Sequence, residues 1–264
     1  MIYFCPTPIG NLKDITLRTI EILKSVDIIF AEDKRNSLKL LNHYNISTKL
    51  YSYHKFNEKS MAQKIIELEN SNNIAIISDA GMPGISDPGY VLIEELIAHN
   101  IEFRVLPGAN AALTALVLSG LETEHFLFYG FCSSKSSARK KELNELKDVK
   151  YTLIFYEAPH RIKEFLKDVY EVFGKRNISI SREITKVFEE TIRINTEEIQ
   201  GIDLMEKGEF VVVIEGSRGT INYDIKSLIL QEINNGNSKS KAVKVVSKKY
   251  NLPKNEVYKE SLDL

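Results

Sequence analysis

The stretch Ile74–Gly89 has the sequence IAIISDAGMPGISDPG, a short apolar run that passes directly into a loop. The run Ile74–Ser78 is rich in β-branched residues and bounded by polar ones, which predicts a buried strand. The loop Ser78–Gly89 holds three glycines, two prolines and two aspartates. Most connections need only about four to six ordinary residues, so we expect this loop to contact a ligand.

Eight similar runs alternate with segments of helical period, which is typical of α/β architecture. One helix is predicted from Ile15 to Val26 after a polar start at Asp14, and another from Ile162 to Phe173, ended by Gly174. Ligands of open α/β sheets bind at the carboxyl ends of strands. The eight further strands are predicted at Ile2–Cys5, Asp27–Ala31, Leu50–His54, Glu102–Leu106, Phe126–Tyr129, Thr152–Tyr156, Ile178–Arg182 and Phe210–Glu215.

The chain of 264 residues is long enough for more than one domain. The break at Ser119-Gly120 predicts an N-terminal α/β domain over residues 1–119, followed by a second α/β domain over residues 120–219. Residues 220–264 differ in composition, since there is no acidic residue between Lys239 and Lys254. We expect a small basic helical appendage there, resembling a helix-turn-helix in outline, although a solvated basic face accounts for the lysines equally well.

A small core is expected inside that appendage. Its apolar residues are spaced as in helices that pack on one another. The predicted core consists of Ala242, Val245, Val246, Leu252, Val257 and Tyr258.

Charge and cysteine content exclude several classes. The 35 basic and 36 acidic residues give a net charge of −1, which argues against a nonspecific nucleic-acid coat but leaves a local basic patch open. Only Cys5 and Cys132 are present, so neither a disulfide framework nor a cysteine zinc site is expected. No apolar window is long enough to span a membrane. We therefore expect a cytoplasmic protein with no metal and no membrane contact.

Two more loops follow predicted strands. Residues 7–15 contain Gly10, which permits close approach of a ligand to the backbone. They lead into a predicted helix whose N-terminal amides suit an anion. A turn that merely caps this helix would have the same sequence pattern. Residues 106–112 lead into a helix of small residues. Together with the Ser78–Gly89 loop they are predicted to form the floor of one pocket.

Charged residues gather at other strand ends. Ala31–Arg35 follows the second strand, and a His54-x-x-Asn57-Glu58 pattern follows the third. In the second half, the segments Phe155–Arg161 and Arg182–Lys186 also place charged residues at the ends of predicted strands. An ion pair between Arg161 and Glu183 that holds the two loops together is one structural explanation for these charges. The chain has no phosphate loop, no dinucleotide fingerprint, no nucleophile elbow and no zinc-protease motif, which disfavours kinases, ordinary dehydrogenases, hydrolases and zinc proteases.

In their order and spacing these motifs resemble the tetrapyrrole methylase superfamily, and within it the branch of the ribosomal RNA small subunit methyltransferases. The chain departs from the usual pattern of that branch at Lys34, at Met82 and at Ala109-Asn110. The resemblance is carried by Thr7–Leu12, Ala31–Asp33, His54–Glu58, Ser78–Gly89, Pro107-Gly108, Gly130-Phe131, Phe155–Arg161, Arg182–Lys186 and Lys207–Glu209.

The resemblance implies a two-domain tetrapyrrole-methylase-like fold with S-adenosylmethionine in the inter-domain cleft. It also implies a homodimer, and 2′-O-ribose methylation of a cytidine in the 16S ribosomal RNA of the small subunit. The three loops suit this cofactor, because it offers hydroxyls, an amino acid and a sulfonium but no diphosphate. The expected cofactor contacts are Thr7, Pro8, Gly10, Asp79, Ala80, Gly81, Met82, Ile85, Ser86, Asp87, Pro107, Gly108, Ala109 and Asn110.

A ribose hydroxyl is a poor nucleophile, so a positioned base or cation would help its attack. One or more of Asp33, Arg35, His54, Asn57 and Glu58 are predicted to orient or deprotonate it. Two alternatives remain: a tetrapyrrole methyltransferase of the same fold, and a ribosome-assembly binder without chemistry. Contacts to RNA are predicted for Lys135, Arg139, Lys140, Lys141 and Arg161.

Overall fold

The computed structural model describes residues 1–218, 224–250, 252–262 and 264. It contains two compact units, Met1–Ser217 and Arg218–Leu264, which are described separately below. The predicted boundary between residues 219 and 220 lies outside the described residues.

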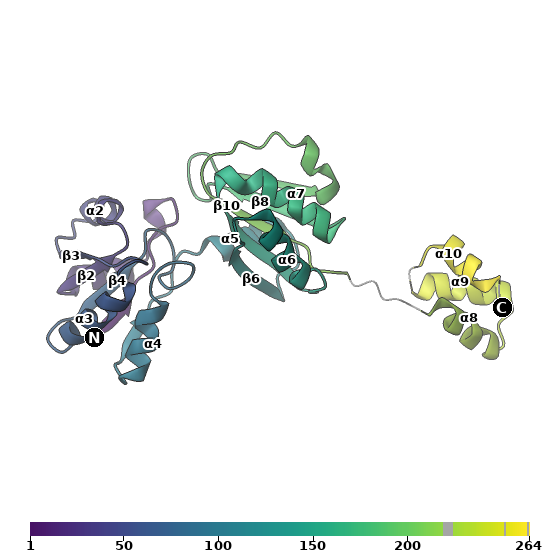
Figure 1. Cartoon of the computed structure of the whole chain (residues 1–264), viewed down its shortest axis with the longest axis horizontal. Coiled ribbons are helices and arrows are strands. Elements are labelled where there is room, and N and C mark those ends of the chain that lie inside the picture. Colours follow the sequence, from purple (N-terminus) through teal and green to yellow (C-terminus); the bar gives the residue numbers. More distant parts are fainter. Residues whose placement is uncertain (219–223, 251, 263) are drawn as a thin grey trace. The chain divides into compact units, whose positions relative to one another are not determined.

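The first sheet is entirely parallel and has the strand order β3-β2-β4-β1-β5. Strands β3, β2 and β4 are labelled in Figure 1. Strands β2 and β4 are buried along their whole length, as expected for a parallel sheet covered on both faces. All five strands were predicted from the sequence. They are β1 (Ile2–Phe4), β2 (Ile28–Ala31), β3 (Lys49–Ser52), β4 (Ile74–Ile77) and β5 (Phe103–Val105).

Helices cover both faces of this sheet. On one face α1 (Leu17–Ser25) and α2 (Lys34–His43) pack Leu23 and Leu40 against the sheet. On the other, α3 (Glu58–Glu69) and α4 (Tyr90–Ala98) contribute Ile65 and Leu92. The adjacent strands β1 and β4 are therefore followed by helices on opposite faces. This arrangement opens a crevice at their carboxyl ends, where α/β sheets bind ligands.

The first helix begins later than the sequence predicted. Residues Leu12–Asp14 form a 3₁₀ turn, and α1 starts only after Thr16, whose side chain accepts a hydrogen bond from the backbone N–H of Thr19 at 3.1 Å. The expected start at Asp14 was wrong because the threonine hydroxyl supplies the N-cap. The predicted helix at Ile162–Phe173 and its end at Gly174 are confirmed.

The second sheet is mixed, with the order β6-β7-β10-β8-β9. Strands β6 and β7 are parallel, and the other neighbours are antiparallel. The edge strand β9 (Glu190–Asn195), of sequence ETIRIN, was not predicted, although Ile192 and Ile194 alternate with polar residues and pack against the core. The four predicted strands are β6 (Phe126–Phe131), β7 (Thr152–Glu157), β8 (Asn177–Arg182) and β10 (Phe210–Ile214).

Helices α6 (Ser136–Leu146) and α7 (Ile162–Phe173) cover one face of the second sheet, along with a 3₁₀ segment at Thr196–Gly201. A further 3₁₀ turn, Pro159–Arg161, precedes α7. The other face carries α5 (Ala111–Ser119), whose Ala115 and Leu116 pack against Ile154 and Val211. This helix precedes the predicted boundary at residue 119, yet it packs on the second sheet.

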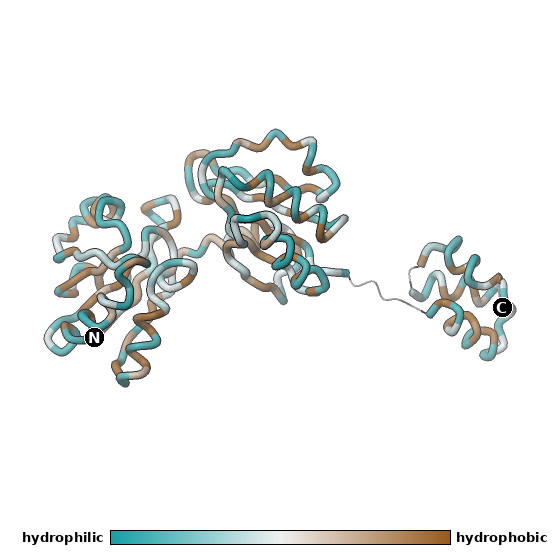
Figure 2. Tube along the Cα trace, viewed as in Figure 1, coloured by the Kyte–Doolittle hydropathy of each residue, from teal (hydrophilic) through white to brown (hydrophobic). Residues whose placement is uncertain are grey.

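The C-terminal unit contains α8 (Ile225–Asn234), α9 (Lys239–Lys249) and α10 (Lys254–Ser261). Hydrophobic and hydrophilic residues alternate along these helices in Figure 2. Of the predicted core residues, Val245 is only half-buried and Tyr258 is 57% exposed. Successive helical residues turn by about 100°, which places Val245 beside the buried face and off its centre. The core is made by Ile229, Ala242, Val243, Val246 and Val257.

None of the helices in the described part of the chain combines the length and apolar character needed to cross a membrane.

Candidate functional site

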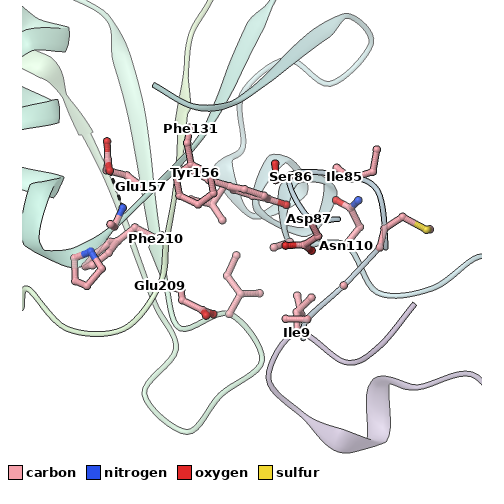
Figure 3. Close-up of a pocket in the computed structure, with 18 residues that line it drawn as sticks. Ile9, Ile85, Ser86, Asp87, Asn110, Phe131, Tyr156, Glu157, Glu209 and Phe210 are labelled. Carbon is pink, nitrogen blue, oxygen red and sulfur yellow. Dashed lines mark hydrogen bonds between the residues drawn. The ribbon is translucent and has the colours of Figure 1, made fainter. Parts of the chain in front are cut away.

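A cavity of about 300 Å³ lies within the Met1–Ser217 unit, between the carboxyl ends of the first-sheet strands and the second sheet (Figure 3). This volume is within the range of small-molecule sites. The loop after β4 supplies much of one side, through Ala80–Met82 and Ile85–Asp87. Ile9 from the loop after β1 and Asn110 at the start of α5 complete that side.

Backbone hydrogen bonds tie these loops together. The N–H of Thr7 donates to the carbonyl of Gly81 at 2.9 Å, and the N–H of Gly81 donates to the carbonyl of Thr7 at 3.0 Å. The buried Thr7 hydroxyl donates to the carbonyl of Ser78 at 3.1 Å. Asn110 caps α5, accepting from the N–H of Leu113 at 3.0 Å. The loops therefore hold one another in place on this side of the cavity.

Gly10 lies where the first loop meets the second half of the unit. A Cβ atom at this position would lie 2.8 Å from the carbonyl oxygen of Ile184, so only glycine fits without displacement. The N–H of Asn11 next to it donates to the Thr185 hydroxyl at 3.1 Å. The close approach expected of Gly10 is thus made to the loop after β8, and the 3₁₀ turn separates it from the N-terminus of α1.

The cavity brings together half of the expected cofactor contacts. Thr7, Pro8 and Gly10 flank Ile9 without lining the cavity, and Asp79 lies outside it. The contacts that line the cavity are Ala80, Gly81, Met82, Ile85, Ser86, Asp87 and Asn110; those that do not are Thr7, Pro8, Gly10, Asp79, Pro107, Gly108 and Ala109.

The opposite side was not assigned from the sequence. Phe131 lies at the end of β6, Tyr156 near the end of β7, and Phe210 and Val211 at the start of β10; Ile184 lies in the loop after β8. The motifs Gly130-Phe131, Phe155–Arg161, Arg182–Lys186 and Lys207–Glu209 were the available signal, although none of them shows which side chains face the cavity. Ala111, Glu157, Ala158, Pro159 and Glu209 also line it.

The charged residues after β2 contact one another and do not line the cavity. Arg35 donates to both carboxylate oxygens of Asp33, and these bonds lower the pKa of that carboxyl to about 2. The N–H of Asp33 donates to Asp79 at 3.0 Å, and Asn36 donates to the same side chain at 3.1 Å. A carboxylate with so low a pKa is a weak base, so this pair is better suited to shaping the loops.

The residues after β3 also make structural contacts. Asn57 accepts from the N–H of His54 at 2.8 Å. Glu58 accepts from the N–H of Gly89 at 2.7 Å and from the Tyr53 hydroxyl at 3.1 Å. None of the five predicted catalytic residues lines the cavity. Glu58 holds the end of the Ser78–Gly89 loop, whereas the ring nitrogen Nδ1 of His54 is buried without a hydrogen-bond partner among the described residues. A role of these residues toward an acceptor outside the cavity stays a prediction.

Two of the predicted RNA contacts are engaged inside the protein. Arg139 is fully buried and pairs with the buried Asp168 at 2.7 Å, so it cannot reach RNA from α6. Arg161 pairs with the buried Glu157, and its Nε donates at 2.8 Å. Lys140 is half-buried and pairs with Asp168 and Glu171. Lys135 and Lys141 are exposed.

The ion pair that was considered between Arg161 and Glu183 does not form. Glu183 instead pairs with Lys186 at 2.8 Å and accepts from the N–H of Glu209 at 3.1 Å. Lys186 also pairs with Glu209 at 2.9 Å. These contacts fix the loop after β8 against the start of β10.

Electrostatically the cavity is acidic. Asp87, Glu157 and Glu209 line it, and no lysine, arginine or histidine of the described residues does so. Burial and the charges of Glu32, Asp79 and Glu209 raise the pKa of Asp87 to about 7. Glu157 and Glu209 are offset by Arg161 and Lys186 behind the wall, so Asp87, unpaired within the described part of the chain, provides most of the negative charge toward a ligand. With no cation on the described lining, the cavity favours a positively charged group over a diphosphate.

Comparisons with known proteins agree with this geometry. Residues 1–200 match the family described as Tetrapyrrole (Corrin/Porphyrin) Methylases. The chain is 44% identical over 270 residues to "Ribosomal RNA small subunit methyltransferase I" of Bacillus subtilis (strain 168), an alignment that covers 98% of this chain and 92% of that protein.

Two solved structures share the fold. Diphthine synthase superposes with a TM-score of 0.67 at 13% identity, covering 81% of this chain and 89% of the other. Uroporphyrin-III C-methyl transferase from Thermus thermophilus, solved in complex with S-adenyl homocysteine, has a TM-score of 0.58 at 15% identity, covering 81% and 96%. The predicted fold is confirmed, and the chain belongs to the tetrapyrrole methylase family.

Proposed function

We propose that the protein transfers a methyl group from S-adenosylmethionine to the 2′-oxygen of a cytidine ribose in the 16S ribosomal RNA of the small subunit. The observation that carries this proposal is the nearly full-length similarity to the Bacillus subtilis ribosomal RNA methyltransferase. The acidic cavity supports the cofactor, since S-adenosylmethionine bears a sulfonium and an ammonium.

The lining residues fit this cofactor. The loop Ala80–Asp87 and the side chain of Asn110 offer polar groups, and Phe131, Tyr156 and Phe210 offer an apolar surface. When bound, S-adenosylmethionine supplies an electrophilic methyl group. The chain contributes by aligning the acceptor with that group and by excluding water from the cavity, and alignment alone accounts for much of the rate of such reactions.

The direct test uses small ribosomal subunits that lack the modification. Incubated with the protein and labelled S-adenosylmethionine, they are expected to gain label at the 2′-oxygen of one cytidine in 16S ribosomal RNA. Labelling of a corrin or porphyrin with none on the subunit would select the tetrapyrrole alternative. Failure to bind S-adenosylmethionine would instead favour the assembly binder.

RNA contact is proposed for exposed lysines in both units. Lys135 is the N-cap of α6, and Lys141 lies within this helix, which follows the cavity residue Phe131. On α9, Lys241, Lys244 and Lys248 are all exposed and, at spacings of three and four, share one helical face. Such faces bind phosphates without reading sequence.

We predict that changing Lys241, Lys244 and Lys248 together to Gln weakens binding to the subunit. Each lost phosphate contact lowers the magnitude of the slope of log affinity against log salt by about 0.7 to 0.9, so three lost contacts should lower it by about 2 to 3. Affinity for S-adenosylmethionine should stay unchanged. The exposed Lys24, Lys49 and Lys64, changed to Gln together, are the matched control. Equal salt slopes in the two triple variants would contradict this assignment.

The proposal also includes a homodimer that works in the cytoplasm. Support for self-association comes from α5, where Val117 is 76% exposed and Leu113 is 48% exposed. Spaced by four residues, these two side chains lie on the same face of α5 and offer an apolar contact to a second copy of the chain. Sedimentation should give twice the chain mass, and Val117→Lys should lower it toward the mass of one chain.

A further inference from the structure

The three carboxylates that line the cavity differ in what they contact. Glu157 accepts from the Arg161 side chain at 2.8 Å and from the N–H of Ala158 at 2.7 Å. Glu209 pairs with Lys186 at 2.9 Å. The Asp87 carboxyl accepts no hydrogen bond and pairs with no cation among the described residues. One oxygen of Glu157, Oε2, is buried without a partner, but among the described residues Asp87 is the cavity carboxylate with both oxygens left for a ligand.

The surroundings of Asp87 are acidic on both sides. Glu32 and Asp79, from the strand ends of the first sheet, and Glu209, from the start of β10, act on it with negative charge. The Tyr156 hydroxyl also lies within electrostatic range, and the charge of Asp87 contributes to raising the pKa of that phenol. Figure 3 shows the Asp87 side chain among residues that come from both halves of the unit.

We propose that Asp87 is the general base that accepts the proton of the acceptor hydroxyl, an assignment that rests on the methyl transfer proposed above. Asp87 takes the hydroxyl proton while the oxygen–carbon bond to the methyl group forms and the carbon–sulfur bond breaks. The electron pair of that bond stays on sulfur, which becomes a neutral thioether. The proton leaves Asp87 to water after the product departs.

The chemistry of this base matches the task. A general base works best when its pKa is near the working pH, and burial with like charges places the pKa of Asp87 at about 7. The low pKa of Asp33, by contrast, leaves that carboxylate a weak base. A cationic cofactor in the same cavity offsets the neighbouring negative charges and lowers the pKa of Asp87 again. Binding of the cofactor therefore readies the base by releasing its proton.

The proton release can be measured without turnover. Calorimetry of S-adenosylmethionine binding at pH 7, in buffers of different ionisation enthalpy, counts the protons released. The wild type should release up to about half a proton more than Asp87→Asn, because a carboxyl with a pKa near 7 is about half protonated there. Equal counts in the two proteins would overturn the assignment.

Turnover on the subunit supplies the second readout. In Asp87→Asn, kcat should fall by about 100-fold or more. The Kd for S-adenosylmethionine should rise by a smaller factor, because the substitution removes the charge that is coupled to the bound cofactor. The wild-type kcat/KM for S-adenosylmethionine, which reports the protein without bound cofactor, should rise with pH through about 7, since the deprotonated carboxylate is the active form. This acid limb should be absent in Asp87→Asn. Asp148→Asn, an exposed aspartate outside the cavity, is the matched control and should behave as wild type.

A second variant keeps the test decisive if Asp87→Asn folds poorly. Glu32→Gln removes the like charge that acts most strongly on Asp87 and should move the acid limb to lower pH; an unmoved limb would overturn the assignment. Wild-type turnover in Asp87→Asn would also overturn the assignment of the base, but the proposed function would stand because the subunit is still methylated. If the wild-type protein methylates no subunit, both the proposed function and the assignment of the base are wrong.

Discussion

The first-sheet side of the cavity consists of loops, whereas the second-sheet side consists largely of strand ends. The loops are held by reciprocal hydrogen bonds between Thr7 and Gly81. On the opposite side, Phe210 and Val211 are held by the pairing of β10 with β7, opposite Glu157 and Tyr156. We infer that the first side depends on local backbone geometry, while the second depends on the stability of the sheet and its core.

The largest expected effect tests the core behind the second side. Arg139→Ala leaves the buried Asp168 without its main partner, which should lower the free energy of unfolding by about 3 kcal/mol or more. Denaturant titration measures this change. Lys141→Ala, exposed on the same helix, should stay within about 0.5 kcal/mol. A loss below about 1 kcal/mol in Arg139→Ala would show that the pair does not support this half.

The contact between the two sides is tested at Gly10. Gly10→Ala would place a Cβ atom 2.8 Å from the carbonyl oxygen of Ile184, and such overpacking costs about 1 to 3 kcal/mol. We expect weaker binding of S-adenosylmethionine by calorimetry, because the loop that carries Ile9 must shift. Gly201→Ala, which meets nothing within 4 Å, is the control. Equal affinities in both variants would mean that the halves adjust to each other freely.

The smallest effect concerns the loop side itself. Asn110→Ala removes the N-cap of α5 and should destabilise the protein by about 1 kcal/mol, measured as a shift in the thermal midpoint. Asn110→Ser restores a capping oxygen and should recover most of the loss. If both variants lost equal stability, the cap would not be what fixes this loop.

Much of the fold could be predicted because strands and helices follow local patterns. The strand at Ile74–Ile77 is a plain apolar run. By contrast, β9 has the sequence ETIRIN, in which only Ile192 and Ile194 alternate with polar residues, and this short pattern becomes a strand through pairing with β8.

The site was predictable only on its loop side. The density of glycine and proline between Ser78 and Gly89 marked that loop, and Asp87 within it lines the cavity. Tyr156 and Phe210 lie in ordinary strand sequences, and their exposure to the cavity follows from how the sheet packs. The type of a residue also does not reveal its partner. Arg139 was predicted to contact RNA, but in the folded chain it pairs with Asp168, which is distant in the sequence.

The reciprocal hydrogen bonds between Thr7 and Gly81 also determine which segments must be transferred together if this site is moved into another protein. Because Thr7 and Gly81 each satisfy a main-chain donor and acceptor of the other, the shape of each loop depends in part on the presence of the other. A transplant of the Ser78–Gly89 loop into another parallel sheet would have to carry the segment around Thr7 with it. This side of the site is therefore formed by two loops together. The loops follow adjacent strands and are joined by a hydrogen bond between Thr7 and Ser78, which are 71 residues apart in the sequence.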